Sequence, residues 1–228
     1  MHTLIEIDRN LLVFFNGSDS LFLDNLVVTL TSGLTWIPLY LSLLYIVIKN
    51  NETMKQIMLV IGCVCLCMLI SDGVVDFIVK PMVGRLRPTH DPAIKYSLDV
   101  VNNIRENQFS FFSAHASNTF CIAVFFSLLV RNCKFVVAMI IWSLLNCWTR
   151  LYLGVHYPSD ILVGILWGGF VGAFVYYIYI KSYLHIHSDF NYISSKYTST
   201  GYNQMDIDIV LSVLVVTLLY AIIKSLIF

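Results

Sequence analysis

The sequence is poor in charged residues and carries no net charge. Only 12% of its 228 residues are charged, and 14 Lys and Arg balance 14 Asp and Glu. Soluble domains contain about 25% charged residues, so this composition disfavours a soluble domain. Without a basic balance there is also no electrostatic reason to expect a nucleic-acid partner.

Metal-site and disulfide patterns are missing as well. No spacing of Cys and His matches a zinc site, so we expect neither a metal nor another cofactor. Of the six cysteines, Cys133 lies in a short polar connection and the others lie in apolar runs. Buried thiols are therefore favoured over a disulfide framework. The start carries Glu6 and Asp8 rather than basic residues, so we expect no cleaved signal peptide.

Long apolar runs are what the sequence has in abundance. Hydrophobic residues make up 58% of the chain, and runs of about 17–25 apolar residues are typical of transmembrane helices. We predict an all-α, polytopic membrane bundle in which residues 1–228 form one domain, with about six core spans. The clearest predicted spans lie at 35–48, 57–79, 113–130, 135–153 and 160–180.

Both ends and one early stretch are less regular. Residues 1–17 place apolar side chains at helical spacing, which predicts an amphipathic helix in the membrane interface. Residues 20–33 are apolar but interrupted by Asp24 and Asn25, so they form either a half-crossing or a tilted first span. The apolar run at 206–228 is either an additional span or an anchor.

The longest polar stretch inside the bundle is the loop at 81–110. Long loops in compact proteins often have a binding or lid function. Apolar residues recur in it at spacings of three and four, which predicts an amphipathic helix on the membrane surface. These residues are Ile94, Leu98, Val101 and Ile104.

Charge in the connections predicts which face is cytoplasmic. The turns at 49–55, 131–134 and 181–196 are basic or mixed, and they share one side if every run crosses once. The positive-inside rule places that side in the cytoplasm. The 81–110 loop and the turn around His156 then share the opposite face.

Asp72, Asp76 and Lys80 are spaced four residues apart, so they share one helix face. Ionisable groups within a span usually face a bundle interior or a watery cavity. We predict that the two carboxylates balance or orient Lys80 and nearby arginines. A metal site is the weaker alternative, because no further ligands follow at a fitting spacing.

A second polar cluster lies around the end of the predicted span at 135–153. Arg150 is near the end of that span, His156 lies in a short turn, and Pro158 suits the first turn of a new helix. Asp160 then lies one turn into that helix, where a carboxylate can fix the tautomer of an imidazole and stabilise its cation. The alternative is an ordinary loop histidine beside a helix-start aspartate.

Alternation of the spans brings the polar groups to one membrane face. Cations there can clamp phosphate oxygens, one histidine can act as a nucleophile, and a second can act as an acid for the leaving group. Arginine suits bidentate contacts with phosphate. The converging residues are Lys80, Arg87, Ser113, His115, Arg150 and His156.

Three stretches resemble the signature motifs of the type 2 phosphatidic acid phosphatase superfamily, and their order and spacing match over about residues 57–180. Phe112, Ala114 and Thr149 stand where the family has Pro, Gly and Ser, and none of these changes removes a chemical group. The matching stretches are Lys80, six residues, Arg87-Pro88; Phe112-Ser113-Ala114-His115; and Thr149-Arg150, five residues, His156, three residues, Asp160.

The resemblance implies an integral membrane lipid phosphatase that needs no metal. In that family pattern His156 is the nucleophile that forms a phosphohistidine, Asp160 orients it, and His115 is the general acid. The phosphate would be held by Lys80, Arg87, Ser113, Arg150 and the backbone N–H of Ala114.

The partner implied is a phosphorylated lipid reached sideways from the bilayer. Candidates are a polyprenyl pyrophosphate, a lipid A phosphate, and phosphatidylglycerol phosphate or phosphatidic acid. The small size suggests a bacterial member in the inner membrane with a periplasmic active site. A lipid phosphotransferase would use the same site. A transporter would spread its charges through the bundle depth, and a vanadium-dependent haloperoxidase, which shares the motifs, would be soluble.

Overall fold

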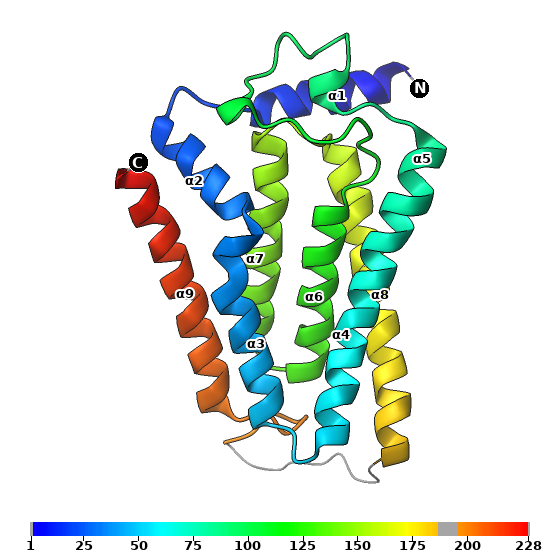
Figure 1. The fold of residues 1–228 in the computed structure, drawn as a ribbon, viewed down its shortest axis with the longest axis vertical. Coiled ribbons are helices and arrows are strands. Elements are labelled where there is room, and N and C mark those ends of the chain that lie inside the picture. Colours follow the sequence, from blue (N-terminus) through cyan, green and yellow to red (C-terminus); the bar gives the residue numbers. More distant parts are fainter. Residues whose placement is uncertain (1, 187–195, 228) are drawn as a thin grey trace.

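The computed structural model describes residues 2–186 and 196–227, and this part of the chain is an all-α bundle, as the sequence predicts. Helices α3, α4, α6, α7, α8 and α9 run along its long axis, and α1 lies across one end (Figure 1). The predicted cytoplasmic segment at 181–196 falls partly outside the described residues. The helices are α1 (His2–Phe15), α2 (Leu21–Thr31), α3 (Ile37–Lys49), α4 (Met54–Val74), α5 (Lys80–Val83), α6 (Ala114–Val130), α7 (Cys133–Tyr152), α8 (Pro158–Ile186) and α9 (Gln204–Ile227), with a π-helical turn at Val75–Val79 and 3₁₀ turns at Gly33–Trp36, Pro88–His90 and Val101–Asn103.

Within the described residues, four helical stretches are long and apolar enough to cross a membrane, namely Met54–Val83, α7, α8 and α9. The predicted span at 35–48 is not sufficient alone: α3 has 13 residues, or about 20 Å at 1.5 Å per residue, against a hydrocarbon core of about 30 Å. Helix α3 is long enough to cross the membrane only if it is counted together with α2, and the two are bent by 67° relative to each other. Helix α6 is apolar but shorter, with 17 residues.

Helix α1 uses its two faces differently. Asp8 and Leu12 are buried against the bundle, whereas Ile7, Leu11 and Phe14 are exposed. The apolar stripe read from the sequence therefore points outward. This arrangement suits a helix that lies in the membrane interface and contacts the bundle through its other face.

The loop between α5 and α6 contains no surface helix, so that prediction is wrong. Its described structure is made of turns and short 3₁₀ segments. Ile94 and Leu98 pack against Leu12 and Tyr157 at the end of the bundle. The apolar residues in this loop are therefore spaced for burial against neighbouring elements and not along a helix face. In addition, Asn102 has a left-handed backbone, with φ 48°, which a continuous right-handed helix does not allow.

Helices α6 and α8 approach each other along a row of glycines. Gly164, Gly168 and Gly172 recur every fourth residue on α8 and face the α6 backbone. A Cβ atom at Gly164 would lie 2.7 Å from the carbonyl oxygen of Ser113, and one at Gly168 would lie 2.3 Å from that of Ser117. Small residues allow such close backbone contact in membrane bundles. The row therefore fixes the start of α6 relative to the start of α8.

We expect Gly168→Ala to destabilise the protein by about 1–3 kcal/mol, the usual cost of overpacking a close contact. Gly62→Ala on α4 is the control, because a Cβ there would meet nothing within 4 Å and a helical Gly→Ala change gains about 0.5–1 kcal/mol. Thermal unfolding in detergent compares the two variants. Equal unfolding temperatures would contradict the close-packing argument.

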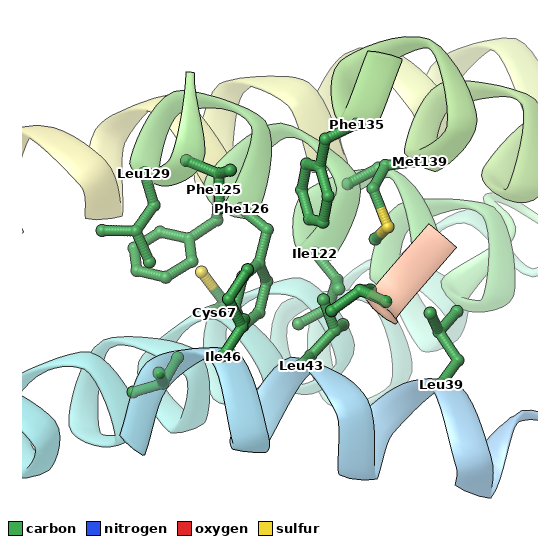
Figure 2. Close-up of a cluster of buried hydrophobic side chains, with 14 of the residues drawn as sticks. Leu39, Leu43, Ile46, Cys67, Ile122, Phe125, Phe126, Leu129, Phe135 and Met139 are labelled. Carbon is green, nitrogen blue, oxygen red and sulfur yellow. The ribbon is translucent and has the colours of Figure 1, made fainter. Parts of the chain in front are cut away.

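The hydrophobic core fills the space between α3, α4, α6 and α7 (Figure 2). Its aromatic side chains include Phe125 and Phe135, both fully buried. Ile46 and Cys67 reach them from α3 and α4. This apolar interior holds the polar ends of the helices in place at the end of the bundle near α1.

Candidate active site

The third motif stretch forms the turn between α7 and α8. Arg150 lies in the last turn of α7, His156 follows in the connection, and Asp160 lies in the first turn of α8. Gly154 lets the chain reverse because it adopts a φ of 63°. His156 is 2% exposed and Asp160 is fully buried. The carboxylate and the imidazole are thus brought together out of water.

The contacts of His156 define its proton position. Its Nε2 lies 2.9 Å from Nη1 of Arg87, and its Nδ1 lies 3.6 Å from Oδ2 of Asp160. A guanidinium can only donate, so Nε2 accepts and the proton resides on Nδ1, facing the carboxylate. Burial, followed by the positive charges of Arg87, Arg150 and Lys80, holds the pKa of His156 well below its usual value. The free site therefore keeps this histidine neutral.

Arg87 and Arg150 are held in fixed positions around the histidine. The Nε of Arg87 donates to the carbonyl of Asn107, and its Nη1 donates to that of Val155 at 2.9 Å. Burial lowers the pKa of Arg87 to about 10, so it stays charged at neutral pH. Nη1 of Arg150 donates to Oγ1 of Thr31 on α2 at 2.7 Å.

Glu106, which sequence analysis did not single out, bridges these two arginines. Its Oε2 lies 2.9 Å from Nη2 of Arg87, and its Oε1 contacts Nη2 of Arg150. Two converging guanidinium groups form a fork that suits an oxyanion. The carboxylate thus marks an anion-binding position directly beside His156. An acidic residue in the long loop between two motifs was the only sequence signal for it.

The second motif stretch begins α6. Ser113 is the N-cap, with its Oγ accepting from the Ala116 N–H, and its own N–H donates to the Asp160 carbonyl at 3.1 Å. His115 follows in the first turn. Its ring lies beside Asn146 of α7, and its buried Nε2 has no well-formed hydrogen bond among the described residues. The histidine is thus left with a nitrogen available to a ligand.

An apolar cavity of about 450 Å³ extends from His115 into the bundle between α3, α4, α6 and α7. Asn118 and Thr119 are polar residues at its lining, and most other lining groups are aliphatic or aromatic. A space of this chemistry suits a hydrocarbon chain rather than a polar ligand. The apolar lining includes Leu43, Val60, Val64, Met68 and Ile122.

Lys80 forms an ion pair with Asp76, so the predicted balancing role is confirmed for that carboxylate. Asp72 instead accepts a hydrogen bond of 2.9 Å from Asn118 on α6. Among the described residues there is no cluster of three or more His, Cys, Asp and Glu side chains that could hold a metal ion. The charge of Lys80 nonetheless reaches His156 and helps lower its pKa.

The three departures from the family motifs are accommodated locally. Phe112 is buried, and its ring centroid lies 6.3 Å from that of Trp167 on α8. Thr149 donates to the Asn146 carbonyl at 2.7 Å. Ala114 is not among the residues with a left-handed φ, so its methyl group causes no backbone strain.

Two further charged residues reach the site without having been singled out as site residues. Arg85 contacts Oδ1 of Asp160 at 2.8 Å through Nη1, and it pairs with Asp8 of α1 at 2.6 Å through Nη2. Arg85 lies within the first motif stretch, but the motif itself does not specify it. In the sequence, Asp8 counts only as an acidic residue near the start of the chain that argues against a signal peptide.

The fold and the site together define a bundle of apolar helices with a buried histidine beside two arginines that a carboxylate bridges. A model of the PAP2 superfamily matches residues 59–183, more than half of the chain. The chain belongs to the PAP2 superfamily.

The similar proteins agree with this assignment. The chain is 37% identical to the lipid A 4'-phosphatase of Bacteroides thetaiotaomicron, over 82% of this chain and 83% of that protein. It is 33% identical to the lipid A 4'-phosphatase of Porphyromonas gingivalis, over 79% and 76%. A crystal structure of a transmembrane PAP2-type phosphatidylglycerolphosphate phosphatase from Bacillus subtilis shares the fold, with a TM-score of 0.58 over 79% of this chain and 88% of that chain, at 19% identity.

The family, these relatives and the apolar helices identify a multi-pass membrane lipid phosphatase, a phosphoric ester hydrolase. The expected lipid phosphatase class is thereby confirmed.

Proposed function

We propose that this protein, with residues 1–228 acting as one domain, removes the 4'-phosphate of lipid A by way of a phosphohistidine. The observation that carries this is a neutral His156 in contact with Arg87, which a carboxylate bridges to Arg150, together with an apolar cavity that has His115 in its lining. The choice of lipid A is supported by two lipid A 4'-phosphatases that are similar over about four fifths of the chain.

In the first half-reaction, Nε2 of His156 attacks the phosphorus in line with the lipid oxygen. An N–P bond forms, the P–O bond to the lipid breaks, and His115 gives a proton to the departing oxygen. The imidazole becomes cationic as it is phosphorylated, and Asp160, 3.6 Å from Nδ1, stabilises that charge. Arg87 and Arg150 stabilise the phosphoryl oxygens in place of Glu106.

In the second half-reaction, water attacks the phosphohistidine. His115 accepts the proton from the water, the N–P bond breaks, and inorganic phosphate leaves with His156 neutral again. The remaining phosphate oxygens are held by the side chains of Ser113 and Lys80 and by the backbone N–H of Ala114. That N–H is available because the first N–H groups of a helix have no partner within the helix. No metal is assigned a part in either step.

The lipid reaches the site from within the bilayer. The cavity between α3, α4, α6 and α7 takes an acyl chain, which places the leaving oxygen at His115. The site lies at the α1 end, opposite the connections α3–α4 and α6–α7 (Figure 1). With those basic turns in the cytoplasm, the active site faces the periplasm from the inner membrane.

The test is phosphate release by the purified full-length protein in detergent, with a chelator present. The panel consists of bis-phosphorylated lipid A, undecaprenyl pyrophosphate and phosphatidylglycerol phosphate, with mass spectrometry locating the phosphate lost. We expect release of the 4'-phosphate of lipid A without added metal. Preferential hydrolysis of another lipid would reject the lipid A assignment. Appearance of the phosphate on an acceptor lipid rather than in solution would show a phosphotransferase.

Glu106→Gln is expected to tighten inhibition by inorganic phosphate by about tenfold, which corresponds to 1.4 kcal/mol. The carboxylate competes with an oxyanion for Arg87 and Arg150, whereas a neutral amide competes less well. Inhibition constants for phosphate measure the effect. Glu52→Gln, in the turn before α4, is the control. Unchanged phosphate inhibition in Glu106→Gln would show that the carboxylate does not occupy the phosphate position.

A further inference from the structure

Asp160 uses its two carboxylate oxygens for different partners. Oδ2 faces Nδ1 of His156 at 3.6 Å and accepts from the Tyr157 N–H at 3.1 Å. Oδ1 accepts from Nη1 of Arg85 at 2.8 Å. The side chain is fully buried, so Arg85 is the cation that compensates it directly.

Arg85 is itself fixed from the other side by the N-terminal helix. Its Nη2 pairs with Oδ2 of Asp8 at 2.6 Å, and its guanidinium lies over the Tyr157 ring at 3.9 Å. The Oδ1 of Asp8 accepts from the Ser159 N–H at 2.9 Å, at the first turn of α8. A continuous chain of contacts therefore runs from α1 through Asp8 and Arg85 to Asp160 and His156.

We propose that Asp8 and Arg85 are positioning residues, through which α1 holds the Asp160 carboxylate in the orientation that serves His156. The inference rests on the proposed function of His156 as the nucleophile. Arg85 contacts Asp160 and not Glu106 or His156, so it acts on the histidine through the carboxylate. Groups that orient the partner of a reactive residue typically contribute about 10–100-fold.

The burial pattern of α1 supports this role. Asp8, at 7% exposed, and Leu12 are among the residues by which the helix meets the bundle, while Ile7, Leu11 and Phe14 face outward. A carboxylate on the buried face of an interfacial helix is costly unless it is paired. Its partners are Arg85 and Ser159. Helix α1 is thus part of the active-site structure rather than an anchor alone.

The charges around the site predict opposite effects for the two residues. The pKa of His156 is lowered directly by the charges of four groups, namely Arg87, Arg150, Lys80 and His115. Arg85 instead partly neutralises the carboxylate of Asp160. Arg85→Gln leaves the negative charge of Asp160 less compensated, which favours the imidazolium and moves the acidic limb of the pH profile to higher pH. Removal of the Asp8 carboxylate leaves Arg85 less compensated, which moves that limb to lower pH.

The experiment compares four variants of the full-length protein for kcat, KM and pH profile. Arg85→Gln and Asp8→Asn are expected to lower kcat by about tenfold or more, with KM within about twofold of wild type. Arg85→Lys keeps the charge and should recover part of the loss. Arg9→Gln is the matched control, since Arg9 is the neighbour of Asp8 on α1 and pairs with Asp91, whereas Arg85 pairs with Asp8 and Asp160.

An equal loss of kcat in Arg9→Gln and Asp8→Asn, or acidic limbs that do not move, would overturn the positioning role. The titration of His156 is followed separately by NMR of ¹⁵N-labelled histidine in detergent, which does not depend on any lipid being hydrolysed. Opposite movements of that titration support the positioning role even if lipid A proves to be the wrong substrate. Absence of both movements refutes the role even in an active enzyme.

Discussion

Replacing His156 with alanine is expected to abolish phosphate release, with a loss of about 10⁴-fold or more in kcat, since removing a nucleophile leaves only binding and charge stabilisation. The imidazole of His156 is buried, and its Nε2, the nucleophile in the proposed mechanism, lies 2.9 Å from Nη1 of Arg87. Rapid quenching of a reaction with ³²P-labelled lipid should trap label on wild type. The adduct should be acid-labile and stable to alkali, as expected of a phosphoramidate.

His90→Ala is the control for this loss. His90 lies in the same loop as Arg87, and its Nδ1 shares a hydrogen bond of 3.2 Å with Oγ1 of Thr89 rather than contacting the arginine pair. Its variant should keep wild-type kcat and labelling. Covalent label that persists in His156→Ala would assign the nucleophile to another residue and reject the proposed mechanism.

His115→Asn is expected to lower kcat on the lipid by about 10²–10⁴-fold, the usual contribution of a general acid. The lipid oxygen is a poor leaving group without a proton, and His115 is the histidine in the lining of the apolar cavity. p-Nitrophenyl phosphate needs no such proton, so its first step should be nearly unaffected. A burst of nitrophenol followed by slow turnover is the expected signature, because the proposed mechanism also uses His115 to activate the water.

Stopped-flow absorbance measures that burst, and its amplitude should match the enzyme concentration. Asn118→Ala is a useful comparison, since Asn118 lines the same cavity but donates to Asp72 and should show no burst. If His115→Asn lowered the rates on lipid and on nitrophenyl phosphate equally, without accumulating phosphoenzyme, its role would be in binding rather than proton transfer.

Local spacing predicted where the motif residues lie along the helices, because these positions are tied to helix boundaries. Pro158 begins α8, and Asp160 therefore lies in its first turn. Ser113 caps α6, which places His115 in the first turn of that helix. Caps and helix starts depend on near neighbours in the chain, so a single sequence can reveal them.

The loop between α5 and α6 shows where such reasoning fails. The spacing of Ile94 and Leu98 predicts a helix, yet these residues lie in a turn and the bend after it, and their side chains are buried against Leu12 and Tyr157. Periodicity indicates only that a side chain must leave water. Whether it does so on a helix face or by packing on distant residues depends on what the rest of the fold supplies.

The membrane class, the order of the helices and the polar groups at His115, Arg150 and His156 could be predicted from the sequence, because they follow from apolar run length and short-range spacing. That Glu106 bridges the arginines and that Asp8 reaches Asp160 through Arg85 became evident from the folded chain. Those contacts join residues far apart in the chain. Charge pairing depends on distance in space, which one sequence does not encode locally.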